Sequence, residues 1–129
     1  MENIKLISTF FFWIFIYTFL LAFGQVLLKL GVNQIGTFSA KGIEEALQIV
    51  FLAIKNPYII GACTLLTSSF FLWMAILSWF KLSLALPLTA ITYIIVAVLS
   101  YFMLDEKLAL LNYFGIVLVT AGVFFLVYK

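Results

Sequence analysis

Four long apolar stretches limit what this 129-residue chain can fold into. They cover residues 7–29, 57–80, 84–104 and 108–128, and each approaches the roughly 20 residues that a helix needs to cross a hydrocarbon core. Backbone amides that face lipid have no water to bond, so such stretches must be helical. A transmembrane barrel is excluded because its strands require an alternation of apolar and polar residues that is missing. We therefore expect one all-α integral membrane domain over residues 1–129, an antiparallel bundle of four transmembrane helices.

Composition points the same way and excludes several classes of function. Apolar residues make up 67% of the chain and charged residues 9%, whereas a water-soluble domain carries about a quarter charged residues. The lysines occur singly and arginine is absent, so we expect no nucleic-acid binding. Histidine is absent and Cys63 is the only cysteine, so we expect no metal and no cofactor. No nucleophile–base pair or carboxylate dyad stands out, and we expect no enzymatic activity.

The first connection has a structure of its own. Between residues 40 and 55, apolar residues recur at helical spacing: Ile43, Leu47, Val50, Phe51 and Ile54. This pattern predicts an amphipathic helix in the membrane interface, between the first and second spans. Ser39 is its expected cap, and Pro57 is expected to start the next span, where its missing N–H costs nothing. The alternative is that this stretch extends the second span beyond the bilayer.

The remaining connections set the arrangement but not the orientation. The links at residues 81–83 and 105–107 are short, so spans two, three and four are expected to be antiparallel neighbours. Lysines divide almost evenly, three on one side and four on the other, so the positive-inside rule leaves topology open. A cleaved signal is not expected, because residues 10–28 exceed a typical signal core and three more spans follow.

The first span carries a polar stripe formed by Thr18, Ala22, Gln25 and Lys29, which share one helix face. Polar groups in lipid are expensive and usually face a bundle interior or a wet cavity. Gln25 and Lys29 are therefore candidate substrate-binding residues, with Lys29 as a point charge for an anionic group such as a phosphate. The alternative for Lys29 is that it marks the helix end and reaches toward the lipid headgroups.

The third span adds Pro87, Thr89 and Tyr93 as candidates. Pro87 removes an early helical hydrogen bond, and freed carbonyls and hydroxyls at membrane depth are typical of transporter sites. Alternatively, the threonines bond back to their own helix. Asp105 and Glu106 precede the fourth span, where a helix dipole favours carboxylates; Glu106 is also a candidate for pairing with a lysine or for proton coupling.

The fourth span places Asn112, Gly115 and Gly122 on one face. Small residues in register let membrane helices approach closely. The partner is either another helix of this chain or a second subunit.

Four segments resemble the drug/metabolite transporter superfamily, and in particular its four-helix EamA-type members, which include the subunits that flip aminoarabinose-phosphoundecaprenol. They are GQVLLK at residues 24–29, SLALPL at 83–88, LDE at 104–106 and GIVLVTAGV at 115–123. The resemblance implies a helical bundle working as a homodimer or as a heterodimer with a related four-helix subunit. It nominates Gln25, Lys29, Pro87 and Glu106 as functional positions, and it places Gly115 and Gly122 in the subunit contact.

The leading hypothesis is a dimeric transporter in the inner (plasma) membrane. Its expected substrate is amphiphilic and phosphate-bearing, with a lipid-linked sugar as the best single example. Two alternatives are an exporter of small metabolites or drugs and a non-transporting membrane subunit of an envelope-biosynthesis complex.

Overall fold

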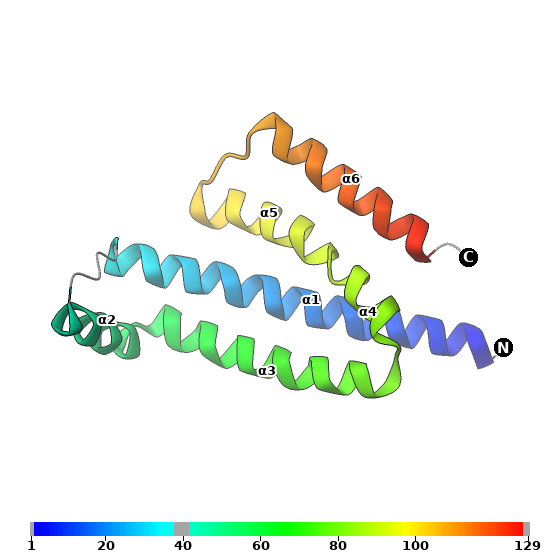
Figure 1. Cartoon of the computed structure of the whole chain (residues 1–129), viewed down its shortest axis with the longest axis horizontal. Coiled ribbons are helices and arrows are strands. Elements are labelled where there is room, and N and C mark those ends of the chain that lie inside the picture. Colours follow the sequence, from blue (N-terminus) through cyan, green and yellow to red (C-terminus); the bar gives the residue numbers. More distant parts are fainter. Residues whose placement is uncertain (1, 38–41, 128–129) are drawn as a thin grey trace.

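A computed structural model describes the backbone of residues 2–37 and 42–127 and the side chains of residues 8–37 and 42–125. Within that part the regular structure is entirely helical (Figure 1). The helices are α1 (Glu2–Ile35), α2 (Ile43–Lys55), α3 (Pro57–Trp79), α4 (Leu82–Leu88), α5 (Ile91–Leu104) and α6 (Leu110–Val127). The predicted cap Ser39 and the predicted end of the fourth span at residue 128 lie outside the described residues.

Three described segments are long and apolar enough to cross a membrane: Ser8–Ile35, Pro57–Trp79 and Leu82–Leu104. The fourth predicted span appears as a shorter apolar helix, Leu110–Phe125. The first helix continues to Ile35, well past the predicted end at residue 29. Lys29 therefore lies more than one helical turn inside α1, and not at the helix end.

Helix α1 is the centre of the arrangement. It packs against α3 on one side and against α5 on the other, and α6 lies beyond α5 (Figure 1). The second and third predicted spans meet through α4, which packs on α3, whereas α5 packs mainly on α1. Small side chains on α1 favour its central position. Thr18 and Ala22 are fully buried, and small residues let a neighbouring helix approach closely.

One end of the helix assembly is closely packed. Its buried core consists of Phe10, Ile14, Ile76, Ala85 and Leu88, from α1, α3 and α4. Aromatic pairs extend this core. The rings of Phe10 and Phe80 lie 4.2 Å apart, and Tyr17 stacks on Trp73 at 4.9 Å. Val123 near the end of α6 also packs against this cluster. These contacts close the end of the molecule where α1 begins and α3 ends.

Two glycines allow α1 and α3 to approach closely. A Cβ added at Gly24 would lie 3.1 Å from Leu66, and one added at Gly31 would overlap Ile59. Where α3 begins, the side-chain oxygen of Asn56 accepts hydrogen bonds from the N–H groups of Tyr58 (2.9 Å) and Ile59 (3.3 Å). Pro57 occupies the first helical position, as the sequence predicts.

The third apolar segment is broken after its proline. Helix α4 ends at Leu88, one residue after Pro87, and α5 starts at Ile91. Short turns bridge the break, in which the N–H of Ala90 donates to the carbonyl of Pro87 at 3.1 Å. The buried hydroxyl of Thr92, just beyond the break, has no hydrogen-bond partner among the described residues. Pro87 itself has no N–H to donate to the carbonyl of Ser83, one turn earlier.

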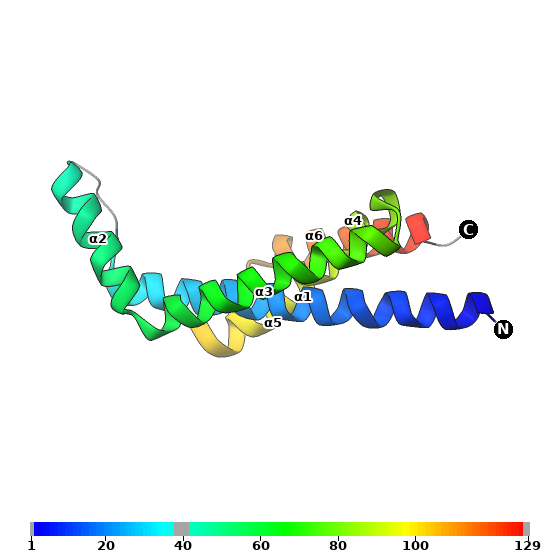
Figure 2. The same ribbon diagram turned by 90° about the horizontal axis from the view of Figure 1, so that it is seen from below.

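Helix α2 leaves the far end of the assembly at a steep angle to α1 and α3 (Figure 2). It begins at Ile43, and none of its residues is buried. Five exposed apolar side chains lie along one side: Ile43, Leu47, Val50, Phe51 and Ile54. The ammonium group of Lys55 lies 4.1 Å from the centre of the Phe51 ring. The predicted amphipathic pattern therefore forms a helix whose apolar face is left exposed by the part of the chain that the structure describes.

Candidate functional site

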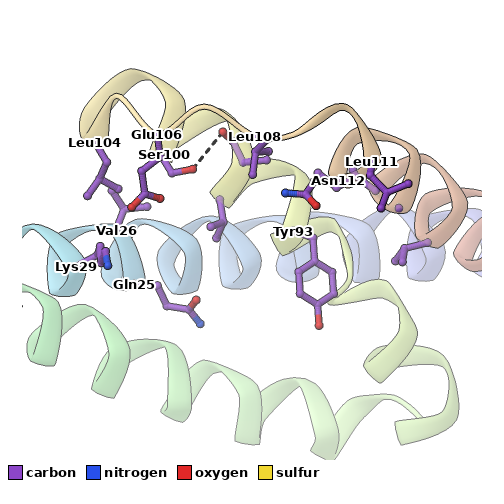
Figure 3. A pocket seen from close by; sticks show the side chains of 15 residues that line it. Gln25, Val26, Lys29, Tyr93, Ser100, Leu104, Glu106, Leu108, Leu111 and Asn112 are labelled. Atoms are coloured by element: carbon purple, nitrogen blue, oxygen red, sulfur yellow. Dashed lines mark hydrogen bonds between the residues drawn. The ribbon is translucent and has the colours of Figure 1, made fainter.

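A cavity of about 840 Å³ lies between α1, α5, the 105–109 link and α6 (Figure 3). Six side chains with polar atoms line it: Gln25, Lys29, Tyr93, Ser100, Glu106 and Asn112. The rest of its lining is apolar or glycine: Val26, Val96, Ala97, Leu104, Leu108, Leu111, Gly115, Ile116 and Val119. We call this space the polar pocket. It gathers residues from four separate stretches of the sequence.

The polar stripe of α1 divides into two halves. Thr18 and Ala22 are fully buried, and the Thr18 hydroxyl donates to the carbonyl of Phe15 at 3.0 Å. Gln25 and Lys29 are exposed and line the polar pocket. The first half therefore serves helix packing, and the second half presents an amide and an ammonium group to the pocket.

Glu106 reaches the polar pocket because of a sharp turn at the end of α5. Asp105 adopts the left-handed conformation (φ 53°), which aspartate tolerates better than most residues. The N–H of Glu106 then donates to the carbonyl of Ser100 at 3.3 Å, closing the helix end. Asp105 and Glu106 therefore follow the C-terminus of α5, and the expectation that they sit at the next helix's N-terminus is wrong, because α6 starts at Leu110.

The two charges of the polar pocket come from opposite walls. Figure 3 shows the Glu106 carboxylate pointing toward the turn of α1 that bears Val26 and Lys29. Among the described residues, Lys29 and Glu106 form no salt bridge within 4.0 Å. Both groups are exposed, so the pocket offers a cation and a carboxylate that are both available to a ligand.

Two further predicted positions face the same space. Tyr93 of α5 is 63% exposed and lines the polar pocket, and Asn112 lines it from the first turn of α6. Gly115, one turn further along α6, completes that wall. Ser100 also lines the pocket, but its hydroxyl donates to the carbonyl of Ala97 at 3.3 Å. It therefore offers a ligand only its oxygen lone pairs.

Three predicted positions lie outside the lining of the polar pocket: Pro87, Thr89 and Gly122. The Thr89 hydroxyl donates to the carbonyl of Leu86 at 2.7 Å, which is the bonding to its own helix that the sequence left open. A Cβ added at Gly122 would meet none of the described residues within 4 Å. Pro87 lies in the last turn of α4, just before the break, so its effect on the pocket would be exerted through the direction of α5.

Sequence reasoning missed most of the apolar wall. Val26, Leu104 and Val119 line the polar pocket, but in a chain that is two thirds apolar such residues carry no signal. Helical periodicity gave a partial signal for Val119, because this residue shares its helix face with Asn112 and Gly115.

No family model, curated protein or solved structure matches this chain. The likeness to drug/metabolite transporters therefore remains an expectation based on the four short segments described above. What the polar pocket does has to follow from its own chemistry: one ammonium, one carboxylate, two amides and a phenol within apolar walls.

Proposed function

We propose that this chain is a four-span membrane transporter that works as a dimer and moves an amphiphilic, phosphate-bearing substrate across the inner (plasma) membrane. The drug/metabolite transporter superfamily, in its EamA-type branch, is the family that we propose for it. A lipid-linked sugar phosphate is the substrate that we propose. In this proposal α6 is the fourth span, although it is shorter than the other three.

The observation that carries the proposal is the gathering of Gln25, Lys29, Tyr93, Glu106 and Asn112 around one cavity. Polar and charged groups at membrane depth are costly and usually mark substrate or ion pathways. Lys29 would hold the phosphate as a point charge. Gln25, Tyr93 and Asn112 would hydrogen-bond the sugar hydroxyls, and Glu106 would take a donor of the head group or a proton.

The helix assembly is closely packed at one end and open at the other, and this difference suggests which helices move during transport. The aromatic core joins α1, α3 and α4 at one end, while the polar pocket separates α6 from α1 toward the other end. The break after Pro87 lies between them in the chain. We propose that α5 and α6 rock about this break to expose the pocket to alternate sides, as broken helices do in other transporters.

Two glycines of α6 that no described helix packs against support a dimer. Gly24 and Gly31 are seven residues apart, and side chains of α3 pack against both of them. Gly115 and Gly122 have the same spacing, and a Cβ added at either would meet no described residue within 4 Å. Every described side chain of α6 except Ile116 and Val123 is exposed. A second copy, or a related four-helix subunit, packing on this face would extend the polar pocket between the two protomers.

The amphipathic helix has a place in the same proposal. Its uncovered apolar side would lie at the headgroup boundary, with Glu44, Glu45 and Gln48 toward water. Because α2 leaves the assembly steeply at the end where α1 stops (Figure 2), it would lie roughly along the membrane plane when α1 and α3 cross it.

The proposal is tested by transport of a fluorescent polyprenyl-phosphate sugar into or across phosphatidylcholine vesicles that hold the purified chain. Lys29→Ala and Gln25→Ala should each lower the transport rate severalfold or more, since each removes a polar contact to the head group. Lys81→Ala is the matched control, because Lys81 is exposed and does not line the polar pocket. Unchanged transport in both pocket variants would remove the proposed roles of Gln25 and Lys29.

A further inference from the structure

A second hollow lies on the other side of the α5–α6 pair. It has a volume of about 280 Å³, and apolar and aromatic side chains line it: Ile94, Val98, Tyr101, Phe102 and Tyr113. We call it the apolar groove. Ala97 and Ile116 line both the apolar groove and the polar pocket. These two residues therefore form the partition between the two spaces.

The apolar groove faces away from the proposed subunit contact. Tyr113 and Gly122 are nine residues apart on α6, which places them about 180° apart around the helix at 100° per residue. If a second subunit covers the glycine face, the groove lies on the outside of α6, against the lipid. Phe102 is 77% exposed and Val98 is 50% exposed, so the groove is open to acyl chains.

We propose that the apolar groove holds the alkyl or prenyl tail of the transported amphiphile while the polar pocket holds its phosphate-bearing head. The inference rests on the proposed transport function and specifies where the substrate enters: sideways from the bilayer, between α5 and α6. The phosphate-bearing head moves past Ala97 and Ile116 into the polar pocket, and the apolar tail stays in the groove.

Three features of the molecule support this division. The two spaces are separated only by Ala97 and Ile116, which line both of them. Both charged groups and both amides are on one side only, since Lys29, Glu106, Gln25 and Asn112 line the polar pocket and none of them lines the groove. The α5 side of the partition is an alanine, so only a methyl group has to be passed there. A ligand that fits both spaces has a charged end and a long apolar end.

Photocrosslinking locates the tail. The purified chain in phosphatidylcholine vesicles is labelled with dodecyl phosphate that bears a diazirine on its terminal carbon, and the modified peptides are mapped by mass spectrometry. We expect the label that excess dodecyl phosphate competes away to fall on Val98, Phe102 and Tyr113. Competition by dodecanol should be much weaker, because the alcohol lacks the charge that Lys29 binds.

The outcomes separate this inference from the transport proposal. Competed label that disappears in Lys29→Ala but maps to other helices, such as the exposed Phe70 and Phe71 of α3, would overturn the tail groove and leave the polar pocket standing. Label that no phosphate competes away, with equal intensity on all lipid-exposed residues, would count against both.

A variant of the partition gives an independent test. Ala97→Phe raises the α5 side of the partition by a whole ring and should reduce transport of dodecyl phosphate at least as much as Lys29→Ala does. Uptake of glycerol phosphate, which has no tail to thread, should fall less. Ala46→Phe is the control, since Ala46 is exposed on α2, away from the proposed subunit contact, and lines neither space. Equal transport of dodecyl phosphate by both variants would overturn the inference.

Discussion

The amide nitrogen of Asn56 donates a hydrogen bond to Oε1 of Gln34 at 3.0 Å. The oxygen of the same Asn56 side chain caps α3 by accepting from the N–H groups of Tyr58 and Ile59. One side chain thus joins the last turn of α1 to the first turn of α3, at the point where α2 departs. This junction fixes the end of the assembly that lies beside Lys29.

Replacing Asn56 separates the two roles of this junction. Asn56→Ala removes the cap and the link to α1, and we expect a loss of about 1–2 kcal/mol in stability. Asn56→Asp keeps the accepting oxygen but loses the donor, so it should cost clearly less. Thermal unfolding in a mild detergent measures both. If the two variants were equally destabilised, the cap would contribute little.

Glycine substitutions should have opposite consequences on α1 and on α6. Gly31→Ala forces a Cβ against Ile59 and Asn56, and overpacking of this kind costs about 1–3 kcal/mol. Gly122→Leu meets open space among the described residues and should leave the thermal stability of the monomer unchanged, but it should weaken self-association. Crosslinking yield in vesicles measures self-association, and thermal unfolding in detergent measures the stability of the monomer. A Gly122→Leu chain that still crosslinks fully would argue against the subunit contact.

Removing Pro87 should straighten the α4–α5 segment. Pro87→Ala restores an N–H inside the helix, where proline costs about 3 kcal/mol, and it lets Thr92 bond back to its own helix. We expect higher thermal stability, slower amide exchange across residues 84–92 and slower transport. Pro57→Ala is the matched control, because Pro57 is at the first helical position of α3. Faster exchange in Pro87→Ala would contradict the hinge.

Cysteine scanning tests whether the polar pocket is wet. In a Cys63→Ser background, cysteines at positions 25 and 29 should react with a water-soluble methanethiosulfonate reagent in vesicles. Cysteines at positions 18 and 22 should react far more slowly, because those side chains are fully buried under the neighbouring helices. Reactivity follows solvent access and thiolate content. Equal protection at all four positions would place Gln25 and Lys29 in a dry environment.

The depth of α2 is measurable with spin labels. Labels at positions 47 and 51, on the apolar side of the helix, should collide mainly with oxygen dissolved in the bilayer. A label at position 48, on the polar side, should collide mainly with a water-soluble nickel complex. Accessibility to the nickel complex at all three positions would show that α2 is surrounded by water, and this would contradict its proposed position in the membrane interface.

The amino-acid sequence by itself determined the helical class, the approximate apolar segments and the amphipathic α2. All three depend on local properties of the chain: hydropathy over about 20 residues and the 3.6-residue period. It also singled out Gln25, Lys29, Tyr93, Glu106 and Asn112, because polar side chains are rare in an apolar chain.

Only the tertiary structure decided which of these side chains meet. Thr18 and Gln25 share a stripe, but contact with neighbouring helices buries the first and leaves the second in the polar pocket. The turn at Asp105 sends Glu106 back toward α1, which no helical period encodes. Likewise, α5 packs mainly on α1, whereas α4 of the same apolar segment packs on α3. Between apolar helices hydropathy is uniform, so shape and small side chains select the neighbours.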